Sequence, residues 1–96
     1  MSGKRDARIA GALLAESVEP LGWWWLSFTD ASRPKGSQFL GVAIVEARGI
    51  AGAVTAAHRL GINPGGAVLA IAIPPEHVPA LSYRNRLLSR DEAEAL

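Results

Sequence analysis

The stretch from residue 38 to residue 73 constrains the fold of this chain most, because the period of its apolar residues changes twice. Residues 38–47 and 67–73 are mostly apolar and are typical of strands. Between them, residues 50–60 repeat apolar side chains at the three- and four-residue spacing of one helical face. A strand–helix–strand unit with short connections crosses over in the right-handed sense and makes its two strands parallel. We therefore expect strands 38–47 and 67–73 to be parallel neighbours.

An aromatic run precedes this unit. Residues 23–29 include three consecutive tryptophans and alternate so that Trp23 and Trp25 lie on one face and Trp24 on the other. The polar segment 30–37 contains a proline and a glycine, as hairpin-type loops do, so this first strand should pair antiparallel with the second. The expected fold class is α/β (α+β), with a small three-stranded mixed sheet in a β-β-α-β core and a short helical C-terminal tail.

The chain of 96 residues and 10.1 kDa has room for one domain, which we divide into three segments. Residues 1–20 form an N-terminal arm that the sequence leaves either partly helical or loose. Residues 21–74 form the core, which ends at two consecutive prolines. Residues 75–96 form a helical tail that packs on the core or on a neighbouring subunit.

Within the tail we expect one helical turn at 76–78, a short helical piece at 81–88 and a helix from residue 90 to residue 96. Ser89 followed three residues later by Glu92 is the pattern of a capping box, which starts that last helix. The main helix covers only one face of the sheet, whereas apolar residues lie on both sides of the strands. The arm, the tail or a second subunit must cover the other face, and we favour a homo-oligomer.

The composition excludes several classes of protein. With 49% hydrophobic and 20% charged residues the chain is not disordered, and a net charge of +1 disfavours nucleic-acid binding. Eight of the ten cations are arginines, which suit carboxylate or phosphate contacts. The absence of cysteine excludes disulfides and thiolate metal sites, and two histidines do not make a metal site alone. We expect no metal and no cofactor.

No segment of the sequence has the length of a membrane span, since the most apolar window, 67–73, has seven residues. The first 15 residues place Lys4 and Arg5 before a short apolar stretch, which superficially imitates a secretory signal. Asp6 interrupts its basic part, so we expect a cytoplasmic protein without membrane contact.

Five segments together resemble a family of small uncharacterised proteins of bacteria and their phages, over roughly residues 21 to 94. They are Trp23–Phe28, Arg33–Gly36, Phe39–Val45, Leu60–Gly66 and Tyr83–Leu88. No activity is established for that family, so the resemblance implies no functional residue. A looser association, by size and origin alone, is with the small αβ proteins by which phages sequester nucleotide signals of host defence.

The expected topology gathers candidate ligand-binding residues at two ends of the sheet. At one end the loop 30–37 brings Arg33 and Lys35 near the turn that contains Asn63. Glycines in both segments let backbone N–H groups approach a ligand, and the cations supply charge for a phosphate or carboxylate. The alternative is two surface turns whose cations are simply solvated.

At the other end the uncapped start of the helix, at Gly49, offers free N–H groups to an anion beside Arg48. Trp23 lies at the same end and can stack on a ring. Arg84 and Arg86 can close over the ligand from the tail or from a neighbouring subunit. Each of these residues also has a structural alternative. The helix start at Gly49 can be hydrated by water, the tryptophans can be core or interface anchors, and Arg84 and Arg86 can lie on a solvated tail.

We expect from these residues a non-enzymatic protein that binds or sequesters an anionic small ligand such as a nucleotide-derived signal, of the phage anti-defence type. The alternative from another class is a protein–protein interaction module, an inhibitor or accessory subunit that docks through a Trp-rich surface. Catalysis is not indicated, because no nucleophile motif accompanies the histidines. A hydrolase that uses His77 and Glu76 as acid and base is the third and weakest reading.

Overall fold

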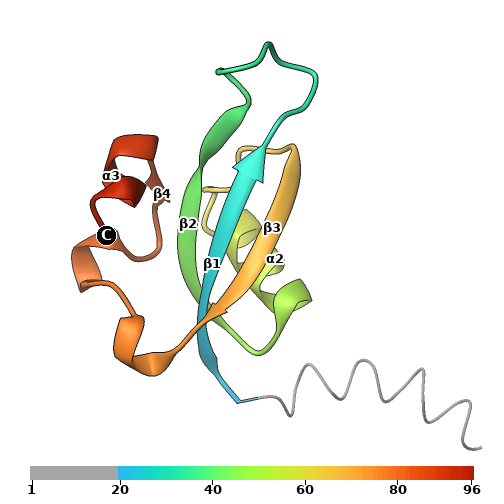
Figure 1. The fold of residues 1–96 in the computed structure, drawn as a ribbon. Helices are drawn as coiled ribbons and strands as arrows, with labels where there is room; N and C mark the ends of the chain where they lie inside the picture. Colours follow the sequence, from blue (N-terminus) through green and yellow to red (C-terminus); the bar gives the residue numbers. More distant parts are fainter. Residues whose placement is uncertain (1–19) are drawn as a thin grey trace, which may run out of the picture.

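The computed structural model describes residues 20–96 as one antiparallel sheet of four strands with helices on both faces (Figure 1). The strand order is β3-β1-β2-β4, which makes β3 and β4 the edges of the sheet. The fold class is α+β. The strands and the two α-helices of the described part are β1 (Gly22–Thr29), β2 (Phe39–Ala47), α2 (Ile50–Arg59), β3 (Ala67–Ile73), β4 (Leu87–Leu88) and α3 (Arg90–Glu94).

The expected antiparallel pairing of the first two strands is confirmed, but the expected three-stranded mixed sheet, with strands 38–47 and 67–73 as parallel neighbours, is wrong. The order of strand, strand, helix and strand is confirmed, but β1 lies between β2 and β3 and pairs antiparallel with both. Strands β2 and β3 therefore run in the same direction without touching as neighbours. The connection from β2 through α2 to β3 passes over β1. The short connections therefore predicted the direction of β3 but not which strand lies next to it.

The position of β1 in the middle follows from its sequence. Trp24, Leu26 and Phe28 face α2, and Leu26 and Phe28 are fully buried there with Ala53 and Ala57 of the helix. The indole Nε1–H of Trp24 donates a hydrogen bond of 3.2 Å to the carbonyl of Ala47. A strand that is apolar on both faces buries more apolar surface at the centre of a sheet than at its edge.

Helix α2 ends as its sequence predicts. Gly61 has a φ of 72°, and its N–H donates to the carbonyl of His58. The N–H of Ile62 donates to the carbonyl of Ala57, which completes a Schellman motif. None of the helices in residues 20–96 has the length and apolar character needed to cross a membrane.

The C-terminal tail packs on the opposite face of the sheet, against the half formed by β2. Leu88 is fully buried with Val42 and Ile44 of that strand. The predicted helical piece at 81–88 is wrong beyond its first turn, because 81–83 forms a 3-10 turn and 87–88 forms strand β4 against β2. The change of direction falls at Asn85, whose φ is 61° and whose N–H donates to the carbonyl of Ile44.

The last helix begins at the predicted capping box. The side chain of Ser89 accepts from the backbone N–H of Glu92, and the carboxylate of Glu92 accepts from the backbone N–H of Ser89. Helix α3 is shorter than expected and ends at Glu94. The predicted arm, 1–20, lies outside the described residues except for Pro20.

Candidate functional site

A surface pocket of about 380 Å³ lies where β1 begins and β2 and β3 end. Its volume falls within the range of small-molecule sites. Strands β1, β2 and β3 and the tail all contribute to its walls. The lining residues are Leu21, Gly22, Trp23, Glu46, Ile73, Pro75, Val78 and Arg84.

The sheet register sets the base of this pocket. Trp23 is paired with Glu46 of β2 on one side and with Ile73 of β3 on the other. Residues paired directly across antiparallel strands project from the same face of the sheet, so these three side chains form one row. This row lies on the face opposite α2, because the neighbouring residue Trp24 faces the helix.

Arg84 forms the polar wall of the pocket. Its guanidinium carbon lies 4.7 Å from the centroid of the Trp23 ring, within the range of a cation–π contact. The Nε–H of Arg84 donates a hydrogen bond of 2.8 Å to the carbonyl of Pro79. Among residues 20–96 that carbonyl is the only hydrogen-bond acceptor of the Arg84 side chain. Within this part of the chain its terminal N–H groups have no acceptor and can contact a ligand.

The pocket carries one charge of each sign. Glu46 is exposed and lines the pocket together with Arg84, but no ion pair joins the two side chains. A guanidinium binds carboxylate or phosphate oxygens, and a carboxylate accepts hydrogen bonds from N–H donors. The arrangement thus suits a ligand that has an anionic group and an N–H edge as well as an apolar or planar body.

The predicted residues at this end of the sheet are only partly brought together. Trp23 and Arg84, both candidates from the sequence, are in contact with each other. Arg48 and Gly49 follow β2 at the same end but are not part of the pocket lining. Gly49 caps α2 without a side-chain hydrogen bond, and no acidic residue lies in the first helical turn. The start of α2 belongs to the helix face of the sheet, whereas the pocket opens on the other face.

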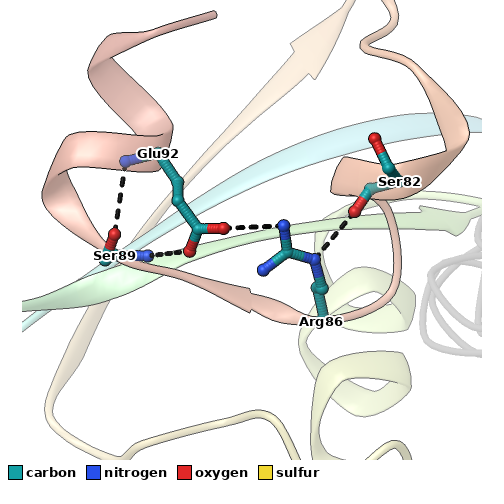
Figure 2. Close-up of polar contacts among 4 residues, drawn as sticks. All are labelled: Ser82, Arg86, Ser89 and Glu92. Atoms are coloured by element: carbon teal, nitrogen blue, oxygen red, sulfur yellow. Dashed lines mark hydrogen bonds and ion pairs between the residues drawn. The ribbon is translucent and has the colours of Figure 1, made fainter.

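Arg86 has a structural role in the tail (Figure 2). Its Nη2 lies 2.7 Å from the Oε2 of Glu92, and its Nε–H donates to the carbonyl of Ser82 over 2.7 Å. The hydrogen bond from Arg86 and that from the backbone of Ser89 hold the pKa of Glu92 at about 2. The same contact with Glu92 raises the pKa of Arg86. Arg86 therefore ties α3 to the segment before β4 rather than lining the pocket.

The predicted residues of the other loop end lie far from this pocket, beyond Thr29. In the loop 30–37, the side chain of Gln38 donates to the carbonyl of Arg33, and Lys35 is exposed. The side chain of Asn63 accepts from the backbone N–H of Gly65 over 2.8 Å. The carbonyl of Arg33 and the side-chain oxygen of Asn63 therefore already have hydrogen-bond partners within their own loop or turn.

Several pocket residues were not among the sequence-based candidates, notably Leu21, Ile73, Val78 and the acidic Glu46. The register of β1 with two partners places Glu46 and Ile73 beside Trp23, and that register required the central position of β1. The residues 20–96 contain no group of three or more His, Asp or Glu side chains that could hold a metal ion. Glu76 and His77, the residues of the weakest reading, are exposed on a 3-10 turn and do not line the pocket.

The chain was compared with protein-family models, curated proteins and solved structures. None of the three comparisons found a match.

Proposed function

We propose that this protein is a non-enzymatic binder of a small anionic ligand with a planar ring, such as a nucleotide derivative, at the pocket of Trp23 and Arg84. The observation that carries the proposal is the guanidinium of Arg84 lying over the ring of Trp23 at the pocket wall. This contact and the hydrogen bond to the carbonyl of Pro79 restrict the position of the guanidinium. A fixed, planar cation loses less freedom when it binds an anion than a solvated arginine does.

The pocket offers the ligand a stacking surface and an anion contact from the same side chain. The Arg84 guanidinium lies over the Trp23 ring, and we expect the ring of a ligand to stack against the planar guanidinium. The terminal N–H groups at the edge of the guanidinium bind phosphate or carboxylate oxygens. Ile73 and Val78 supply apolar contacts around the ring.

Glu46 makes the pocket selective among anionic ligands. A carboxylate only accepts hydrogen bonds, and it repels a ligand edge that presents acceptors alone. The Watson–Crick edge of guanine presents two adjacent N–H donors, whereas that of adenine presents one donor beside an acceptor. We therefore expect guanine nucleotides to bind more tightly than adenine nucleotides. Substitution of Glu46 by Gln should reduce this preference.

Thermal unfolding with a panel of nucleotides tests the proposal. A ligand at about 100 times its Kd should stabilise the protein by about 2.7 kcal/mol. Arg84→Gln should abolish this stabilisation, because it removes both the charge and the stack. Arg86→Gln is the matched control: it changes an arginine two residues away that lies outside the pocket, and it should retain binding. If no nucleotide stabilises the protein, or if Arg84→Gln binds as the wild type does, the proposal is wrong.

A second candidate function is the protein-interaction module, and one observation favours it. The face of the sheet opposite α2 carries an apolar strip, defined here as Trp25, Leu69 and Ile71, with Leu69 63% exposed and Ile71 53% exposed. Adjacent exposed aliphatic side chains on one sheet face are typical of interaction sites. A protein that binds a partner there and gains no stability from nucleotides would support this second candidate instead.

A further inference from the structure

Strand β3 is an edge strand without the protection that such strands usually have. Among residues 20–96 it pairs only with β1, so one row of its backbone N–H and C=O groups has no partner strand in that part of the chain. Its sequence, Ala-Val-Leu-Ala-Ile-Ala-Ile, contains no charged residue, no proline and no polar side chain. Edge strands in monomeric proteins commonly carry charges, prolines or bulges that prevent pairing with another chain. The edge of β3 therefore has the character of a strand that is paired in the native assembly.

The tail leaves this side of the sheet uncovered. It packs over β2, where Leu88 buries Val42 and Ile44, and Figure 1 shows α3 and β4 beside β2, on the side away from β3. Leu69 and Ile71 project from the same face but lie on β3, two strands away from β2, and remain more than half exposed. The unpaired edge and the apolar strip thus adjoin one another.

We propose that a second copy of this chain pairs with this edge, β3 against β3, to form a continuous eight-stranded antiparallel sheet. Two-fold symmetry requires an antiparallel pairing of identical strands about one central point. Ala70 is the middle residue of the seven-residue strand, so a pairing centred there matches every residue of β3 with a residue of its copy. Leu69 then lies opposite Ile71 of the second copy.

The ends of β3 favour this register over its alternatives. Gly66, with a φ of 74°, turns the chain into the strand, and Pro74 begins a proline pair without N–H groups. A pairing shifted toward either end would leave part of the strand unmatched. A pairing centred on Ala70 also keeps the α2 helices of both copies on one face, so that the two apolar strips meet on the other face.

The sequence of the edge favours a second copy over a different protein. A strand with no charged or polar side chain offers nothing to select a charged partner, but it matches itself without repulsion. The paired ladder is about 23 Å long at roughly 3.3 Å per residue. By itself that is a smaller contact than the interfaces of about 1,600 Å² that hold stable complexes. We therefore expect a reversible dimer whose population depends on protein concentration.

Single cysteines test both the contact and its register, because the chain has no native cysteine. In Ala70→Cys the two cysteines lie directly opposite each other, about 4.5–5.5 Å apart at Cα, and should form an intermolecular disulfide on mild oxidation. Ala72→Cys is the matched control on the same strand and face. Its two cysteines would be four residues apart along the paired strands, about 13 Å, which is too far for a disulfide.

Sedimentation analysis over a range of concentrations provides the second measurement. The wild type should shift from monomer to dimer with concentration, and Leu69→Lys combined with Ile71→Lys should remain monomeric. Thr55→Lys, on the exposed side of α2, should dimerise as the wild type does. This test uses no nucleotide, so its failure leaves the proposed ligand pocket untouched.

Two outcomes would overturn the proposal. The first is a wild type that is monomeric at every concentration, whether its apolar strip binds a different polypeptide or residues 1–19 of the same chain. The second is equal cross-linking of Ala70→Cys and Ala72→Cys, which would contradict the register.

Discussion

Replacement of Gly66 by alanine should destabilise the protein far more than the same change at its neighbour Gly65. Both glycines have positive φ angles, 74° and 91°, so each substitution brings the strain of a left-handed alanine, about 1–2 kcal/mol. A Cβ at Gly65 would meet no atom within 4 Å. A Cβ at Gly66 would collide with the backbone carbonyl of Thr29 and approach the Cδ1 of Leu40 at 3.1 Å.

The carbonyl of Thr29 cannot move away cheaply, because Thr29 is paired with β2 on one side and with β3 on the other. Steric overpacking of this kind adds about 1–3 kcal/mol. We therefore expect Gly66→Ala to lose about 2–5 kcal/mol of unfolding free energy and Gly65→Ala about 1–2 kcal/mol. Urea unfolding followed by circular dichroism at one fixed protein concentration measures both losses. Equal losses in the two variants would refute the close approach of Gly66 to the carbonyl of Thr29.

Two further predictions concern the core and the tail. Leu26→Ala, at a fully buried position in the central strand, should cost about 2–5 kcal/mol, whereas Leu81→Ala, at a position 77% exposed, should change stability by less than about 0.5 kcal/mol in the same urea assay. Glu92 has a pKa lowered from 4.5 to about 2, so its ion pair stabilises the fold above pH 4.5 and is lost as the pH falls toward 2. The urea midpoint of Glu92→Gln should thus lie below that of the wild type at pH 6 and approach it near pH 2, and a difference independent of pH would contradict the pairing with Arg86.

Local signals in the sequence predicted the elements of the core well. The change of period at residue 50, the glycine after the main helix and the capping box at Ser89 each depend on residues within one or two turns. Which strand lies next to β3 depends instead on which strand buries the most apolar surface when it takes the centre of the sheet. The tryptophans on both faces of β1 indicate a central strand, whereas the crossover rule gives the direction of β3 and not its neighbour.

The tail was harder to predict, because its structure depends on contacts distant in the sequence. Leu87 and Leu88 form a strand of two residues that exists only because β2 offers it an edge. Local spacing in this segment favoured a helix, and Asn85 at a positive φ ends the turn before it. An isolated two-residue strand leaves no periodic pattern that sequence analysis can detect.

For the candidate site, the sequence identified Trp23 and Arg84 but did not show that they touch. It also placed Arg86 in the same role as Arg84, although the two side chains lie in different surroundings. Arg86 is held by Glu92 of the capping box, and this ion pair became apparent only with the tail in place. Residues two apart in a regular extended segment project to the same side, but the turn at Asn85 interrupts the segment here and separates the two arginines.

The indole N–H signals of the three tryptophans in a nitrogen-15 correlation spectrum test the ligand pocket most directly. Trp23 lines the pocket, Trp24 donates its indole N–H to Ala47 on the helix face, and Trp25 lies in a separate groove of about 260 Å³ beside α3. Titration with a guanine nucleotide should shift the signal of Trp23 and leave those of Trp24 and Trp25 nearly unchanged. Three unmoved signals, or a shift confined to Trp25, would contradict binding at the pocket of Trp23 and Arg84.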